Sequence, residues 1–274
     1  MPTIAASGKC ESDIKIYQVD AFATQAFEGN PAAVCPLESW LSDELMQSIA
    51  AENNLSETAF FVPEGDGFQI RWFTPTTEVA LCGHATLASA FVLFNILDYA
   101  GETIVFESKS GPLPVTRNGD RLVLNFPSEP PEPCKTPAAI VDAFGIEPVE
   151  CLRAVDYLLI FDNAEQVKSA DPDFEKLKKV DCRGVIISAA AEDYDFVARF
   201  FAPNAGVDED PVTGSAYTKL VPYWAGKMGK TKFNARQVSE RGGDLFCELA
   251  GDRVLIAGTA VKILEGTIEI EHGG

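Results

Sequence analysis

The chain has 274 residues, of which 46% are hydrophobic and 23% charged, enough apolar material for a folded core; overall disorder is excluded. Its 22 Lys and Arg against 41 Asp and Glu give a formal net charge of −19, which repels nucleic-acid phosphates and anionic lipid. We therefore expect no nucleic-acid partner and no membrane partner. This length allows either one large domain or two of about 130 residues.

The first half of the chain is predicted to be mainly antiparallel sheet. Residues Met1–Asp13 are small and polar, so we expect a loose extension there rather than a secretory signal. Asn118-Gly119 lies between Leu113–Thr116 and a later strand-like run, which predicts a hairpin closed by a type I′ turn. Short β-branched or aromatic runs bounded by turn residues predict strands at Ile14–Val19, Phe68–Phe73, Thr103–Glu107 and Arg121–Phe126.

Two helices are predicted in this half. Ser42, which two acidic residues follow, can cap a helix that ends near Asn53. The second helix is expected from about His84 to Leu97. It falls within Val79–Leu97, the longest stretch without a charged residue, and the polar residues inside this stretch favour a buried core helix over a membrane span.

A proline-rich segment divides the sequence. Pro127–Pro137 holds five prolines in eleven residues, which suits neither a central strand nor a helix interior. We therefore predict an N-terminal domain at 12–127 and a C-terminal domain at 128–274, with a last strand at about 260–272 that packs back on the first domain. Beyond the boundary the predicted elements are helices at Ala138–Phe144 and Ser215–Ala225 and strands at Leu152–Val155, Leu158–Phe161, Val185–Ala189 and Phe196–Phe201.

The two halves share a sequence pattern. Arg71–Pro75 (Arg-Trp-Phe-Thr-Pro) corresponds to Arg199–Pro203 (Arg-Phe-Phe-Ala-Pro), and each is followed by a loop and then a predicted helix. The helices open with Cys82–Thr86 and Thr213–Ala216, which both contain Gly, a polar residue and then Ala. The pattern predicts two copies of one fold. The alternative is coincidence, because small residues are common at helix starts.

The two helix starts are candidate anion sites, because a helix N-terminus presents free N–H groups and a positive dipole end. If the halves pack about a pseudo-twofold axis, both starts face one interdomain cleft. A carboxylate held there, out of water, would stabilise charge that develops beside it. The arrangement suits the deprotonation of a carbon acid.

Glu57 is the candidate base, because it stands in an otherwise apolar, strand-like run at Asn54–Val62. If it points inward, desolvation would raise its pKa toward neutrality, as reversible proton transfer requires. The alternative is that strand alternation turns it to solvent. In the second half, Asp208–Asp210 crowd the loop before the helix, and like charges in a closed cleft would favour a protonated acid partner. Acids also favour solvated helix starts without any such role.

Histidines and cysteines add few further candidates. His84 falls at a predicted helix start and is open to either packing or function, whereas His272 lies in the C-terminal tail. The seven cysteines are widely spaced without a CxxC pair, so we expect reduced thiols, a cytoplasmic protein and no metal site.

Seven segments follow one another with sensible spacing over roughly Lys15 to Ile263: Val19–Phe22, Phe27–Val34, Leu55–Phe60, Arg71–Thr86, Asp208–Ala216, Gln237–Ser239 and Arg241–Gly243. Together they resemble the PhzF-like phenazine-biosynthesis family. The resemblance implies a diaminopimelate-epimerase-like fold of α/β (α+β) type. In that fold two pseudo-twofold-related halves each wrap a curved, mostly antiparallel sheet around a central helix, with the site between them.

The resemblance also implies roles for individual residues. By position, Glu57 matches the family's general base. His84, Asp210, Ser56 and Ser215 match polar groups around it. Asp20 and Asn30 match motifs that we interpret as structural and do not assign to the site. Helix-start N–H groups toward a substrate carboxylate would come from Gly83, Ala85, Gly214 and Ser215.

The function that follows is a cofactor-independent isomerase that moves a proton on a small carboxylate metabolite, in a protein expected to be a homodimer. The alternative is a metabolite-binding or protein-interaction member that keeps the cleft but catalyses nothing. Related epimerases use two facing cysteines, and Cys82 fits the first position. No cysteine occurs between Cys182 and Cys247 to supply the second, so a two-thiol racemase is disfavoured.

Overall fold

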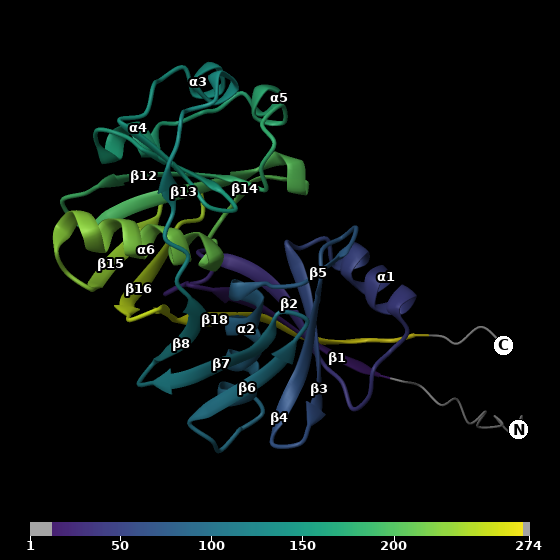
Figure 1. Cartoon of the computed structure of the whole chain (residues 1–274). Coiled ribbons are helices and arrows are strands. Elements are labelled where there is room, and N and C mark those ends of the chain that lie inside the picture. The colour runs from purple at the N-terminus through teal and green to yellow at the C-terminus, as the bar shows by residue number, and fades with distance from the viewer. Residues whose placement is uncertain (1–12, 271–274) are drawn as a thin grey trace, which may run out of the picture.

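The computed structural model describes residues 13–270, which form two lobes, each with a curved sheet and a long central helix (Figure 1). The expected loose extension at Met1–Asp13, apart from Asp13 itself, and His272 lie outside the described residues. The first lobe contains β1 (Ile14–Ala21), β2 (Asn30–Pro36), α1 (Asp43–Asn53), β3 (Glu57–Glu64), β4 (Gly67–Phe73), β5 (Glu78–Val79), α2 (Gly83–Asn95), β6 (Thr103–Ser108), β7 (Gly111–Asn118) and β8 (Arg121–Pro127).

The second lobe follows the proline-rich segment, which begins at the last residue of β8 and otherwise forms only the short strand β9 (Glu132–Pro133). Its smaller helices are α3 (Ala138–Phe144), α4 (Ala164–Lys168) and α5 (Phe174–Leu177). The remaining elements are β10 (Glu150–Arg153), β11 (Tyr157–Ile160), β12 (Val185–Ala190), β13 (Phe196–Ala202), the 3-10 turn η1 (Pro203–Ala205), β14 (Val207–Asp210), α6 (Gly214–Met228), β15 (Lys232–Gln237), β16 (Gly243–Ala250), β17 (Arg253–Gly258) and β18 (Ala260–Ile268).

The pairing of the strands repeats from one lobe to the other. In the first lobe β2–β3 and β4–β6 are parallel, while β1–β2, β3–β4, β4–β5, β6–β7 and β7–β8 are antiparallel. The second lobe has parallel β11–β12 and β13–β15 and antiparallel β10–β11, β12–β13, β13–β14, β15–β16 and β16–β17. The central helices α2 and α6 occupy equivalent places in this order. The predicted duplication of a mostly antiparallel unit is therefore confirmed, and coincidence is excluded.

The central helix of the first lobe, α2, is buried because its sequence is apolar on nearly every side. In α2, all residues from Gly83 to Phe94 except Phe91 are buried, and the helix packs on β1, β2, β3 and β8. The uncharged stretch Val79–Leu97 thus provides the predicted core helix. None of the helices that the structure describes combines the length and apolar character needed to cross a bilayer.

The predicted cap of α1 is confirmed, whereas the predicted turn type of the β7–β8 hairpin is not. Ser42 caps α1 as predicted, since its Oγ accepts a hydrogen bond from the Leu45 N–H at 3.2 Å. The hairpin of β7 and β8 also forms, but its predicted type I′ turn is wrong. Asn118 pairs with Arg121, so the central residues are Gly119 and Asp120, and only Gly119 has positive φ (+65°). Positive φ at the first central residue alone is typical of a type II′ turn.

Strand pairs join the two lobes. β8 of the first lobe pairs antiparallel with β17 of the second, from Leu122–Gly258 to Pro127–Arg253. β18 then returns to the first lobe and pairs antiparallel with β1 along its whole length. These two strand pairs hold the starts of the central helices at a fixed boundary between the lobes.

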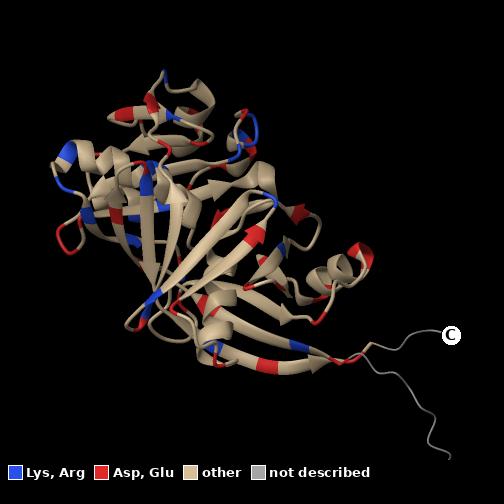
Figure 2. Ribbon diagram, turned by 60° about the horizontal axis from the view of Figure 1, so that its bottom comes forward, with Lys and Arg blue, Asp and Glu red and all other residues tan. Residues whose placement is uncertain are grey.

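Acidic residues are spread over both lobes, as Figure 2 shows, in keeping with the net charge.

Candidate active site

The starts of α2 and α6 contact each other at the boundary of the lobes. A Cβ atom added to Gly83 would lie 3.5 Å from the Cα of Gly214, and one added to Gly214 would lie 3.6 Å from the Cα of Gly83. The residues that precede the two helices, Cys82 and Thr213, make no side-chain cap hydrogen bond, unlike Ser42 before α1. The first N–H groups of both helices thus remain without side-chain caps where an anion would benefit from them.

Glu57 and His84 face each other beside this contact. Glu57 opens β3, which runs parallel to β2, and His84 is the second residue of α2. Glu57 Oε2 lies 3.1 Å from His84 Nε2, and the two side chains are 18% and 5% exposed, so Glu57 points inward rather than to solvent. The approach lacks hydrogen-bond geometry. Both atoms are buried without a hydrogen-bond partner in the part of the chain that the structure describes.

Asp210 joins the site from the second lobe through Asn30. The Nδ2 of Asn30 donates to Asp210 Oδ1 at 2.7 Å and to the Val212 carbonyl oxygen at 3.0 Å, and it lies 3.1 Å from His84 Nδ1. The Thr213 hydroxyl donates to Asp210 Oδ2 at 2.5 Å. Asn30, on β2, therefore connects the histidine of one lobe to the carboxyl group of the other.

Burial shifts the protonation of these groups. Burial raises the pKa of Asp210 to about 6; the charge of Glu57 adds to this shift and that of His84 opposes it. Burial disfavours charge on His84, but its contacts with Cys82 and Glu57 outweigh burial and raise the pKa of His84 well above its ordinary value. The site thus holds a carboxyl group that titrates near neutrality beside a histidine that favours its charged form.

The other predicted residues lie close by with different contacts. Ser56 directly precedes Glu57, and no side-chain hydrogen bond of Ser56 is formed within residues 13–270. Ala85 is fully buried in the first turn of α2. The Ser215 hydroxyl, in the first turn of α6, accepts a hydrogen bond from Arg183 Nη2 at 3.2 Å.

Sequence reasoning missed two residues at this boundary, Asn30 and Arg183. Asn30 lies in a motif that we interpreted as structural, yet its amide contacts both His84 and Asp210. The sequence feature that could have identified Asn30 is its polar side chain within the Gly-Asn-Pro segment. Arg183 lies in no motif. It could have been found only by aligning the segment before β12 with the segment before β3.

Glu57, Cys82 and His84 are also the candidate metal ligands, since one ligand atom from each lies within 4.8 Å of the others. Cys82 Sγ, however, lies 3.6 Å from Nδ1 of His84, while Glu57 approaches Nε2. The two groups thus flank opposite nitrogens of one ring, so as arranged they do not converge on a single ion at zinc-ligand distances of about 2.0–2.3 Å. Burial raises the pKa of the Cys82 thiol to about 11, which keeps it protonated at neutral pH.

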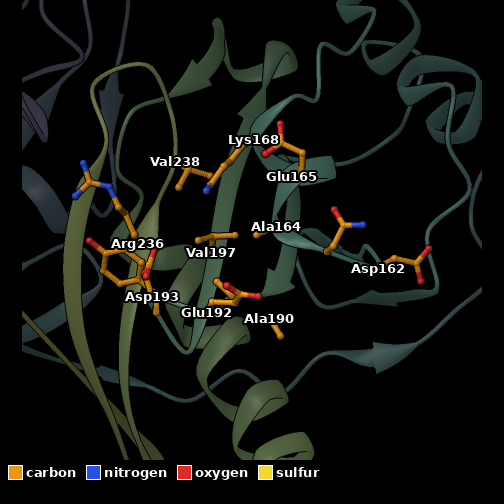
Figure 3. Close-up of a pocket in the computed structure, with 13 residues that line it drawn as sticks. Asp162, Ala164, Glu165, Lys168, Ala190, Glu192, Asp193, Val197, Arg236 and Val238 are labelled. Atoms are coloured by element: carbon orange, nitrogen blue, oxygen red, sulfur yellow. The ribbon is translucent and has the colours of Figure 1, made fainter.

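A cavity of about 830 Å³ lies elsewhere, among α4, the β12–β13 turn and β15 of the second lobe (Figure 3). Charged side chains of both signs line it, including Asp162, Glu165, Lys168 and Arg236. None of the predicted site residues borders it. None of the buried, unpartnered polar atoms of the described chain belongs to its lining either. The candidate site at the helix starts and this cavity are therefore separate places in the described structure.

The duplicated unit and the meeting of its two helix starts define a diaminopimelate-epimerase-like isomerase fold. The fold is similar to a hydroxyproline epimerase from Agrobacterium vitis, with a TM-score of 0.64 at 12% identity over 95% of this chain and 93% of that one. At this identity the likeness shows the fold alone.

Closer relatives define the family. The family model for phenazine biosynthesis-like proteins (PhzC-PhzF) matches residues 19–266, so the chain belongs to this family, as the sequence motifs predicted. A PhzF-family crystal structure from Enterococcus faecalis has a TM-score of 0.92 and 46% identity, and covers 94% of this chain and 100% of that one.

The names of curated relatives indicate the class of enzyme. "Uncharacterized isomerase PA2770" of Pseudomonas aeruginosa is 51% identical over 94% of this chain and 100% of that protein. "Uncharacterized isomerase BH0283" of Halalkalibacterium halodurans is 48% identical over 92% and 97%. The prediction of a PhzF-like isomerase is thus confirmed at the level of class.

Proposed function

We propose that the protein is a cofactor-independent isomerase that moves a proton between two carbons of a small carboxylate substrate, with Glu57 as general base. His84 and Asp210 complete the set of acid and base groups. The substrate carboxylate binds the N–H groups at the starts of α2 and α6, from Gly83, Ala85, Gly214 and Ser215. Ser56, which directly precedes Glu57, contributes to substrate binding beside the base.

The observation that carries this proposal is the buried contact between Glu57 and His84. Glu57 Oε2 and His84 Nε2 lie 3.1 Å apart, within ion-pair distance but without a hydrogen bond. Buried polar atoms are almost always hydrogen-bonded, so two such atoms side by side favour a site that receives a substrate group. A carbon acid supplies a proton to the carboxylate, and its developing anion accepts from the imidazole.

The proton transfer has two steps. Glu57 takes a proton from a carbon adjacent to the bound carboxylate or conjugated with it, and the electron pair delocalises toward the carboxylate oxygens. Helix-start N–H groups stabilise this charge, because they are fixed before the reaction. The proton then returns to a different carbon. Asp210, with its pKa of about 6, can hold a proton at the far side of His84.

The test is enzyme-dependent exchange with solvent. Cyclic and open-chain unsaturated carboxylates are incubated with the enzyme in deuterated water, and label at carbon is measured by mass spectrometry. For a substrate that exchanges, Glu57→Gln should lower the rate at least about 100-fold, because it removes the base without changing shape. Glu64→Gln, at the exposed end of the same strand, is the matched control and should keep the rate.

Two outcomes would contradict the proposal. Exchange that persists in folded Glu57→Gln would exclude this residue as the base. Tight binding of several acids without any label would favour the non-catalytic alternative, a metabolite-binding member of the family. That alternative is not favoured by the relatives, which are named isomerases.

A further inference from the structure

The duplicated fold gives the Glu57–His84 contact a counterpart in the second lobe. In the first lobe, the start of β3 lies against the second residue of α2, which brings Glu57 to His84. In the second lobe, β12 corresponds to β3 and α6 to α2. Arg183, two residues before β12, accordingly lies against Ser215, the second residue of α6, with Arg183 Nη2 3.2 Å from the hydroxyl. By strand register Val185 corresponds to Thr58, so Arg183 takes the place of Ser56, one residue before that of Glu57. A base and an arginine thus come from adjacent positions of the repeat on the two sides of the contact of Gly83 with Gly214.

Arg183 is held in a fixed orientation by buried groups. Its Nε donates at 2.8 Å to Oδ1 of Asp156, and its Nη2 donates to the other oxygen of the same carboxylate, which is fully buried. The guanidinium carbon lies 5.6 Å from the centre of the Phe200 ring. A two-pronged contact with a carboxylate removes most of the rotational freedom of an arginine head group.

The remaining end of the guanidinium is available. The Arg183 side chain is 42% exposed, and its Nη1 makes no hydrogen bond to any residue of the described chain. The Asp156 carboxylate that holds it is also 3.6 Å from the buried Nζ of Lys219, which pairs with Glu129 at 2.8 Å. Two acids and two bases therefore balance within this cluster, so the cluster as a whole does not repel an anion.

An anionic substrate needs such a group at this position. The chain carries a formal net charge of −19, and Glu57 and Asp210 both lie at the site. Helix-start N–H groups can take one carboxylate, yet they supply only partial charges. Arginine is the side chain best suited to a carboxylate, because its planar fork offers two parallel donors.

We infer that Arg183, with Ser215, forms a subsite for a second carboxylate, and hence that the substrate is a small dicarboxylic acid. The inference rests on the proposed function for the first carboxylate and the reacting carbon. The substrate extends from Glu57, across the helix starts, to Arg183. Monocarboxylates that lack the second group lose this contact and bind more weakly.

The experiment measures binding, by calorimetry, of acids that differ only in the second carboxylate. Two pairs of probes are benzoate against isophthalate and crotonate against glutaconate. For the wild-type protein, the dicarboxylate of at least one pair should bind about 10-fold more tightly than its partner, the range expected for a charge-assisted contact. If neither dicarboxylate binds more tightly than its monocarboxylate, the inference is overturned.

Variants then assign the preference to Arg183. Arg183→Gln should reduce it to less than about 3-fold, while Arg183→Lys, which keeps the charge without the fork, should retain part of it. Arg121→Gln, which removes a guanidinium packed over Phe246, is the matched control and should keep it. A preference that survives in Arg183→Gln, or is lost equally in Arg121→Gln, would overturn the inference.

Two further measurements keep the result interpretable. Because Asp156 is fully buried, Arg183→Gln leaves a charge with one partner fewer, so its folding is checked by thermal unfolding. If it is unstable, Asp156→Asn/Arg183→Gln removes both charges and should show the same loss of preference. Glu57→Gln should retain the dicarboxylate preference, so failure of the base assignment is seen in exchange and failure of the subsite is seen in binding.

Discussion

The raised pKa of Asp210 leads to a sharp prediction for the variant Asp210→Asn. Asp210 accepts hydrogen bonds from Asn30 and from Thr213, and the asparagine side chain can keep the first and donate in the second because a hydroxyl also accepts. The variant therefore preserves the packing and removes one titrating group. Its stability relative to the wild type should then depend on pH in a way that reports the buried carboxyl alone.

The magnitude follows from the two pKa values. The pKa of the Asp210 carboxyl is raised from its ordinary value of 3.8 to about 6 by burial in the folded protein. Between these values the folded state binds more protons than the unfolded state, so the stability that Asp210 contributes is present below about pH 4 and is lost as the pH rises through 6. At about 1.4 kcal/mol for each pKa unit, the loss at pH 7.5 is about 3 kcal/mol.

Urea unfolding from pH 4 to 8 provides the assay. The free energy of unfolding of Asp210→Asn minus that of the wild type should increase by about 2.5 kcal/mol between pH 4 and 7.5, because part of the full effect is already present at pH 4. The control is Glu209→Gln on the same strand, where the carboxylate is forked to Arg199 at 2.7 and 2.8 Å. That change should lower stability at neutral pH by about 2 kcal/mol. A difference for Asp210→Asn that stays flat, or falls as the pH rises, would refute the reasoning.

Three further substitutions test separate features. Gly29→Ala should lower the free energy of unfolding by more than about 2 kcal/mol in urea, because φ is +66° and a Cβ would lie 2.1 Å from the Ala21 carbonyl oxygen. Ser42→Ala should lower it by about 1 kcal/mol through loss of the α1 cap, leaving exchange unchanged. Cys82→Ala should keep the deuterium-exchange rate within about threefold, since the thiol is neutral; a 100-fold loss would implicate it in catalysis.

Local signals in the sequence predicted elements whose causes are local. The cap at Ser42, the apolar stretch that forms α2 and the prolines after β8 each act within a few residues. The β7–β8 turn shows the limit of such reasoning. Its register, with Asn118 opposite Arg121, is set by the pairing of whole strands, so the turn falls one residue later than the dipeptide suggested.

The orientation of Glu57 depended on tertiary structure in the same way. Alternation along a strand predicts one solvated face, but β3 is buried at five successive residues from Thr58 to Val62. Its neighbour β2 is parallel, and α1 and α2 both pack on β3. A strand covered on both faces reads as a continuous apolar run, so alternation carries no information there.

The chemistry arises where the two copies of the fold differ. Equivalent helix starts carry His84 in one lobe and Ser215 in the other, and adjacent positions at the equivalent strand starts bring Glu57 to the first and Arg183 to the second. If both sides of the site carried basic groups, either end of an anionic substrate could bind to either side. If both sides carried acidic groups, both would repel the substrate. Under the proposed function, Glu57 on one side of the Gly83–Gly214 contact and Arg183 on the other would orient an acidic substrate in a single direction, because its second carboxylate is attracted to Arg183 only. In that proposal the duplication supplies the paired N–H groups, and the departure from symmetry decides which carbon faces Glu57.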